Sequence, residues 1–120
     1  MTARKPRSIP RDPRLEMSED ALEEHVRRLC KDLGVVRVHH RDSRQTTSGW
    51  PDDVLLGPGG CLFRELKRQD GRATGTQEAM LAALIVAGQD AAIWRPEDLL
   101  SGRIAREITA ISALRSRVRA

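Results

Sequence analysis

The stretch Val54-Leu55-Leu56-Gly57-Pro58-Gly59-Gly60-Cys61-Leu62-Phe63 decides the fold of this chain. Its two apolar runs flank glycine and proline residues with the backbone conformations that a turn requires. This pattern predicts two antiparallel strands joined by a four-residue loop from Gly57 to Gly60. If Leu56 and Cys61 are partners across that loop, the same register places Asp52 opposite Glu65.

Three charged residues near the open end of this hairpin are expected to converge. Partners across an antiparallel pair share one face, with Cβ atoms ~4.5–5.5 Å apart, where like charges repel. Asp52 and Glu65 would therefore share a proton, pair with a cation or bind a metal ion through their oxygens. Lys67 follows Glu65 by two residues, which places both side chains on one face of the strand. The alternative is a surface ion-pair cluster with no catalytic role.

The segments around the hairpin predict a small α/β domain. Apolar residues recur with helical spacing after Ser18, a suitable N-cap, and the pattern ends at Gly34. A second helix is predicted to begin at the cap Thr76 and to stop at Gly88. The other expected elements are strands at 35–39 and 91–94, a helical turn after Pro96 and a last helix along Ile104, Ile108 and Ile111. The predicted order is helix, three strands, helix, strand, helix.

Charge is concentrated at the two ends of the chain. The 120 residues carry a net charge of +4, and residues 1–14 alone carry +4. We expect a disordered or extended basic arm at 1–16, a folded domain at 17–114 and a basic tail at 115–120. Such ends are either solvated tails or a means of holding a polyanion through its phosphates.

Several classes of protein are excluded by composition. No apolar run approaches the ~18 residues that a membrane span needs, and no secretory signal is recognisable, so we expect a cytoplasmic protein without a membrane partner. Cys30 and Cys61 are too few for a disulfide framework and lack the spacing of a zinc site. We expect both to be reduced thiols.

The sequence resembles a known nuclease pattern. Gly49-Trp50-Pro51-Asp52 followed by Glu65-Leu66-Lys67 is similar to the PD-(D/E)xK pattern, and more narrowly to the virus-type replication-repair nuclease (VRR-NUC) family. The resemblance covers about residues 18–111. It extends to Glu19, the segment from His39 through Asp42-Ser43-Arg44, Gln77 and Trp94-Arg95-Pro96.

The resemblance implies roles for individual residues. Asp52, Glu65 and the main-chain carbonyl of Leu66 would hold Mg²⁺ or Mn²⁺, and Lys67 would orient or activate a water molecule. Glu19 would add a carboxylate directly or through water, with Glu23 as the competing candidate and helix-dipole stabilisation as the alternative role of Glu19. Gln77 would contact the nucleophile or a phosphate.

DNA contacts are expected from both the basic ends and the region of the site. We predict Arg4, Lys5, Arg7, Arg44, His39 and Trp50 as DNA-binding residues. His39 and His40 adjoin, so on a strand they would point to opposite faces and would not easily ligate one metal ion. Trp50 would stack on a base or serve the core, and the pattern does not distinguish these roles.

The resemblance implies a restriction-endonuclease-like α/β fold, a small mixed sheet flanked by helices. The implied activity is metal-dependent hydrolysis of DNA phosphodiester bonds, selective for flaps or four-way junctions, by a phage-type enzyme that is often a homodimer. Two alternatives stay open: a catalytically silent DNA-binding or partner-binding module, and an RNA-cleaving nuclease of the same fold.

Overall fold

The structure is a computed structural model that describes residues 10–40 and 48–114. It is an α/β domain with a small mixed sheet of four strands flanked by helices, as the sequence predicted. In chain order the elements are a 3-10 helix η1 (Pro13–Glu16), α1 (Glu19–Leu33), β1 (Val36–His39), β2 (Asp53–Gly57), β3 (Gly60–Leu66), α2 (Gly75–Val86), β4 (Asp90–Trp94), α3 (Pro96–Leu100) and α4 (Arg103–Ser112).

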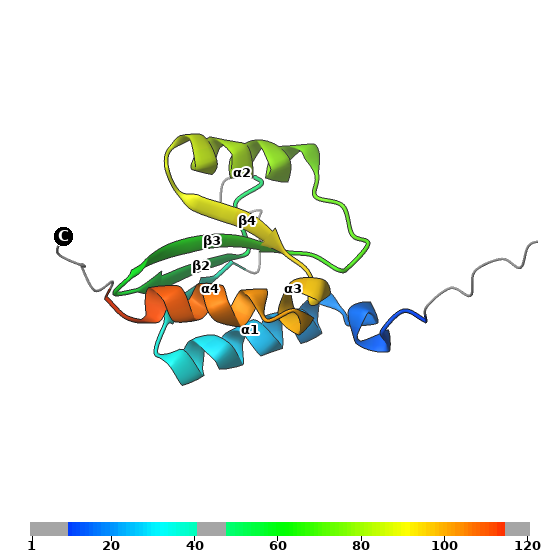
Figure 1. Ribbon diagram of the computed structural model, residues 1–120. Coiled ribbons are helices and arrows are strands. Elements are labelled where there is room, and N and C mark those ends of the chain that lie inside the picture. Colours follow the sequence, from blue (N-terminus) through cyan, green and yellow to red (C-terminus); the bar gives the residue numbers. More distant parts are fainter. Residues whose placement is uncertain (1–9, 41–47, 115–120) are drawn as a thin grey trace, which may run out of the picture.

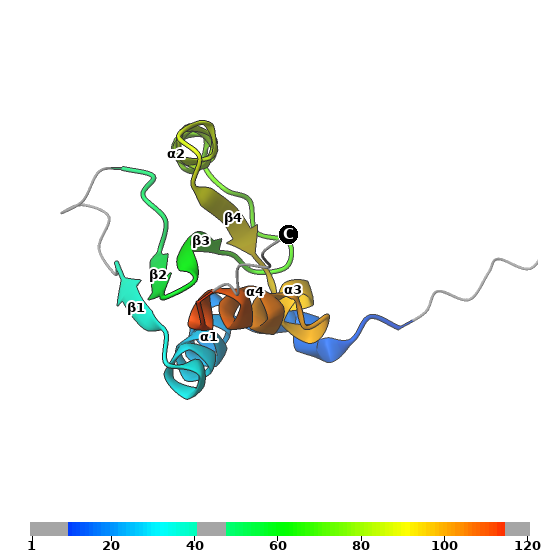
Figure 2. The ribbon, with the colours of Figure 1, turned by 60° about the vertical axis from the view of Figure 1, so that its left-hand side comes forward.

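The sheet separates two layers of helices. Its strand order is β1-β2-β3-β4, with antiparallel pairing up to β3 and parallel pairing between β3 and β4. Figure 1 shows α2 on one side of the sheet and α1 with α4 on the other. In Figure 2, α2 lies over the β4 end of the sheet, away from β1.

The register of the β2–β3 hairpin is as predicted, but its turn is shorter. Leu56 pairs with Cys61 and Val54 with Phe63, and the strands continue to a Gly57–Gly60 pair. The turn is therefore Pro58–Gly59 alone. It packs against the C-terminal end of α4, where the Gly59 amide donates to the Ile111 carbonyl over 2.9 Å.

Local signals define the helix ends, with one correction. The Ser18 hydroxyl accepts from the Ala21 amide at the start of α1, and Gly34 ends this helix with φ 69°, as predicted. The predicted cap Thr76 of α2 is wrong. Thr74 caps the helix in a reciprocal capping box with Gln77, and this box satisfies the backbone amides of both residues.

Each face of the sheet has its own apolar core. The face towards α1 and α4 buries the larger cluster, which includes Leu22, Val26, Leu55, Trp94, Ile104 and Ile108. The face towards α2 buries Leu81, Leu84 and Ala91, with Phe63 and Trp50 partly covered. Both faces of β3 are thus covered, so its polar residues are enclosed rather than exposed to solvent.

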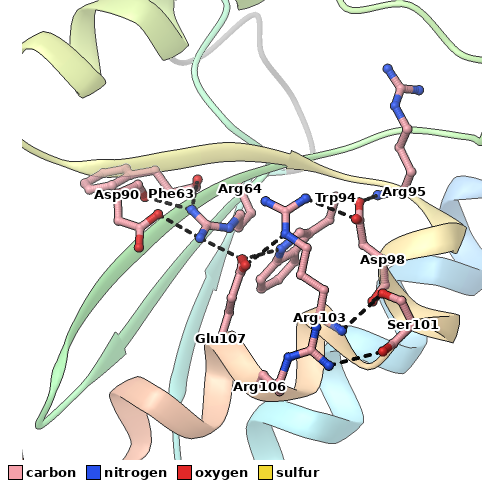
Figure 3. A network of polar contacts seen from close by, with 10 residues as sticks. All are labelled: Phe63, Arg64, Asp90, Trp94, Arg95, Asp98, Ser101, Arg103, Arg106 and Glu107. Carbon is pink, nitrogen blue, oxygen red and sulfur yellow. Dashed lines mark hydrogen bonds and ion pairs between the residues drawn. The ribbon is translucent and has the colours of Figure 1, made fainter.

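A polar network joins β3, β4 and α4 at the edge of the larger core, from the buried Arg64 to the exposed Asp90 (Figure 3). Arg64 is 1% exposed, and its guanidinium donates to Asp90 and to Glu107 over 2.8 and 2.9 Å. Glu107 also accepts from the Trp94 indole over 2.9 Å. Burial acts in the opposite direction, but hydrogen bonds from Trp94 and Arg64 keep the pKa of Glu107 below its ordinary value.

The start of the described chain differs from the expected arm. Residues 13–16, predicted to be disordered or extended, form η1 with Asp12 as its cap. Arg11 makes ion pairs with Glu16 over 3.1 Å and with Asp70 over 3.0 Å. The chain therefore enters the fold beside the loop that follows β3. Within the described ranges, no helix has the length and apolar character to cross a membrane.

Candidate active site

Asp52 and Glu65 lie side by side at the open end of the hairpin. The paired residues extend to Asp53 and Arg64, and the same register continues to Asp52 opposite Glu65. The Asp52 carboxylate accepts from the Leu66 amide over 3.0 Å, which fixes it against β3. Glu65 is 2% exposed, so the pair combines one half-buried and one fully buried carboxylate.

Lys67 and Gln77 both contact Glu65. The Lys67 ammonium lies 3.6 Å from Glu65 Oε1, and the Gln77 amide nitrogen donates to the same oxygen over 2.9 Å. The side-chain oxygen of Gln77 accepts from the Thr74 amide over 2.9 Å, which fixes the orientation of its amide group. Asp52, Glu65, Lys67 and Gln77, the four predicted catalytic residues, are therefore brought together. Gln77 holds a carboxylate in this arrangement.

The electrostatics of Glu65 are unfavourable for an ionised acid. Burial, and then the neighbouring Asp52 carboxylate, raise the pKa of Glu65 to about 8, and Lys67 opposes this only in part. Among the described residues, Glu65 Oε2 is buried without a hydrogen-bond partner. A buried acceptor left unpaired is costly, so this carboxylate is one that a bound cation would stabilise.

The other predicted metal ligands line a cavity beside this pair. The cavity has a volume of about 540 Å³, and Leu66, Asp52 and Glu19 all border it. Its remaining lining residues come from α1 and the end of β1: Asp20, Glu23, Glu24, His39 and His40. Within residues 10–40 and 48–114, no group of three or more His, Cys, Asp or Glu residues has an arrangement that could hold a metal ion. The structure thus places Glu19 at the cavity without joining it to Asp52 and Glu65 as a ligand group.

A buried cluster next to the cavity was missed in the sequence. Asp53 is 0% exposed, and its Oδ1 accepts from Arg37 Nε over 3.0 Å and lies 2.8 Å from His39 Nδ1. Glu23 lies 3.0 Å from Arg37 and 3.3 Å from His39. Burial raises the pKa of Asp53, and Arg37 and His39 counteract this. Only the apolar alternation of β2, which Asp53 interrupts at an inward position, could have indicated this cluster.

This cluster bears on two predictions. Glu23, the competing helix carboxylate, has two cationic or potentially cationic partners, whereas Glu19 makes no ion pair with any described residue. His39, a predicted DNA contact, is 17% exposed in its side chain and lies between Asp53 and Glu23. Its position indicates a structural role, in which His39 links β1, β2 and α1.

Trp50 packs towards the α2 side of the sheet. Its ring meets Phe63 edge to face, with centroids 5.8 Å apart, and His40 at 6.5 Å. Trp50 thus serves the smaller core at least in part. The other predicted DNA-binding residues, Arg4, Lys5, Arg7 and Arg44, lie outside the described residues.

Comparisons with known proteins add no family assignment. The chain matches no family model, no curated protein and no solved structure.

Proposed function

We propose that this chain is a metal-dependent nuclease that hydrolyses DNA phosphodiester bonds, as its resemblance to VRR-NUC nucleases implies. The observation that carries the proposal is the environment of Glu65. This buried carboxylate faces Asp52, one of its oxygens is held by Gln77 and Lys67, and its other oxygen has no partner among the described residues. An arrangement with this electrostatic cost is typical of functional sites rather than of surface ion pairs.

The donors present suit a hard divalent cation. Asp52, Glu65 and the Leu66 carbonyl would hold Mg²⁺ or Mn²⁺, all through oxygen, and Glu19 would take part across the cavity. When bound, such an ion lowers the pKa of a water molecule and stabilises the negative charge that develops on the phosphate. In this proposal Lys67 orients the attacking water, and Gln77 keeps Glu65 in place.

The substrate class rests on the resemblance and on charge. Branched DNA, with a flap or four-way junction, is the proposed substrate, and a homodimer would act on two strands at once. Because α1 contributes four acidic residues to the cavity wall, the phosphates must be held by cations elsewhere. The basic ends supply such cations. Replication or repair in the cytoplasm is the proposed setting.

A nicking assay on supercoiled plasmid DNA tests the proposal. The wild-type protein should nick DNA with Mg²⁺ or Mn²⁺ but not with chelator. Lys67→Ala should lose roughly 10²–10⁴-fold in rate, the usual contribution of a positioned acid–base group. Lys31→Ala removes the same charge from an exposed position in the last turn of α1 and should keep the wild-type rate.

Parallel assays separate the competing functions. Labelled flap, splayed, four-way and linear DNAs define the preferred structure, and matched RNA strands test the RNA alternative. Tight DNA binding without cleavage under any divalent ion would contradict the proposal and favour a catalytically silent module.

A further inference from the structure

The loop of residues 67–74 lies between two residues that contact the Glu65 carboxylate. It begins at Lys67, directly after β3, and ends at Thr74, which forms the capping box with Gln77. Lys67 and Gln77 both reach Glu65 Oε1, over 3.6 and 2.9 Å. Because the loop has no helix or strand of its own, the geometry at Glu65 depends on whatever holds this loop in one conformation.

Arg95 supplies the hydrogen bonds to the main chain of this loop, in addition to the Arg11–Asp70 ion pair and a bond from the Glu97 amide to the Gln69 side chain, both over 3.0 Å. Its Nη1 donates to the main-chain carbonyls of Arg68, Gln69 and Gly71, over 2.8, 3.3 and 2.5 Å. The Gly71 amide donates to the Arg68 carbonyl over 3.0 Å, so these acceptors belong to one tight turn. All three bonds come from one nitrogen with two hydrogens, so the longest of them, to Gln69, shares a hydrogen with a shorter one.

Arg95 is itself anchored at the end of β4. Its amide donates to Asp98 Oδ2 over 2.8 Å, and Pro96 begins α3 directly after it. In Figure 3 the Arg95 side chain points away from the Glu107 network, while its backbone meets Asp98. The neighbouring residue completes the link, since the Trp94 carbonyl accepts from the Lys67 amide over 3.1 Å.

We infer that Arg95 is a positioning residue, which fixes the 67–74 loop so that Lys67 and Gln77 stay on Glu65. The inference rests on the proposed nuclease function for its kinetic consequence. It assigns a role to the Trp94-Arg95-Pro96 segment, which supplies no side-chain group to the Asp52–Glu65 pair.

Kinetics with Arg95→Ala and Arg95→Lys test the inference, with Arg106→Ala as control. Arg106 is also an arginine that donates to a main-chain carbonyl, that of Ser101 over 3.2 Å, but it lies on α4. We expect Arg95→Ala to lose about 10–100-fold in kcat, because small misplacements of catalytic groups are this costly. KM and the salt dependence of DNA binding should stay within twofold of wild type. Arg95→Lys should recover part of kcat, and Arg106→Ala should match wild type.

Two kinetic outcomes would overturn the inference. A raised KM with a salt slope smaller by about 0.9 would make Arg95 a phosphate contact instead. An Arg95→Ala protein as active as Arg106→Ala would show that the loop needs no such support.

Amide hydrogen exchange provides a readout that needs no activity. Arg95→Ala should exchange faster at residues 67–77, while Arg106→Ala should leave this segment protected as in wild type. Unchanged exchange would overturn the inference. If the wild-type protein cleaves no nucleic acid, the proposed function fails, and the exchange experiment still decides whether Arg95 holds the loop.

Discussion

The side chains of the adjacent residues Asp52 and Asp53 point to opposite faces of the sheet. Asp53 faces α1, where its Oδ1 accepts from Arg37 over 3.0 Å and lies 2.8 Å from His39, while its Oδ2 has no partner among the described residues. Asp52 faces Glu65 across the hairpin, where the described residues supply one cation, Lys67, 3.6 Å from Glu65. Asp53 thus has a guanidinium in hydrogen-bond contact, whereas Glu65 has a second carboxylate beside it and its cation further away. Stability and the proposed chemistry conflict at Glu65.

Glu65→Gln should stabilise the protein in a pH-dependent way. The pKa of Glu65 is raised from 4.5 to about 8, so between these values the folded state binds more protons than the unfolded state. The wild-type unfolding free energy therefore declines as pH rises through this range, and glutamine removes the effect. In chelator, the variant should melt near wild type at pH 5 and several degrees higher at pH 8, with ~4–8 °C expected per kcal/mol.

Adding Mg²⁺ at pH 8 should make wild type melt at a higher temperature than Glu65→Gln. Wild type gains about 2.7 kcal/mol at a hundredfold excess of ion over Kd, and the variant, which lacks a ligand, gains little. Glu78→Gln, the same substitution on the exposed part of α2, controls for general charge effects. Equal Mg²⁺ shifts in wild type and Glu65→Gln would contradict the metal site.

At the scale of elements, short-range patterns were sufficient for the hairpin register and for α1. Glycines and a polar cap act within a few residues, so the sequence contains the whole signal. Thr76 was mistaken for the α2 cap because Thr74 and Thr76 both precede the helical pattern, and only the bond to Gln77 distinguishes them. The reciprocal Thr-x-x-Gln spacing, Thr74 to Gln77, was the available signal.

The distant partners of the polar residues in β3 could not be predicted from the sequence. Arg64 has the spacing of a solvent-facing residue, but its partner Glu107 lies 43 positions further along the chain. Because helices cover both faces of β3, the alternation of polar and apolar residues does not show which of its side chains are buried. The partners of Arg95 could not be predicted either. They are main-chain carbonyls, which every residue has, so the sequence does not reveal them.

Gly59→Ala should test the docking of the hairpin turn on α4. A Cβ at residue 59 would clash with the Ala113 carbonyl oxygen and would lie 2.8 Å from that of Ala110. Because these are backbone atoms, the turn or the helix end must move, at a cost of about 1–3 kcal/mol. Gly75→Ala is the matched control, since a Cβ at residue 75 would meet no described atom within 4 Å. Urea unfolding should show the difference, and equal midpoints for the two variants would refute it.

At the scale of the whole molecule, the acidic residues of the cavity wall and the basic residues of positions 1–9 come from different parts of the chain. The acidic wall of the cavity is built by α1, whereas Arg11, the second of the described residues, makes its ion pair of 3.0 Å with Asp70 in the loop after β3. A polyanion near the cavity would be repelled by this acidic wall, so the proposed DNA binding needs cations from another part of the chain.

Removal of residues 1–9 should weaken DNA binding and its dependence on salt. The segment contains three cations and no acid, and each phosphate contact that is removed lowers the salt slope by about 0.9. We expect a slope smaller by up to about 2.7, measured by fluorescence anisotropy at several salt concentrations. A full-length variant with Arg4, Lys5 and Arg7 changed to Gln controls for chain length and should behave alike. An unchanged slope would make this segment irrelevant to DNA.

The docking of the hairpin turn on α4 also sets an order of events during synthesis. The β2–β3 hairpin is synthesised before α4, yet α4 supplies Glu107 to Arg64, three buried isoleucines to the core and the hydrogen-bond acceptor for the Gly59 amide. A nascent chain that has not reached residue 112 therefore has a hairpin without its supporting layer. We therefore expect the residues around Asp52 and Glu65 to reach their final arrangement only once α4 is free to dock on the sheet.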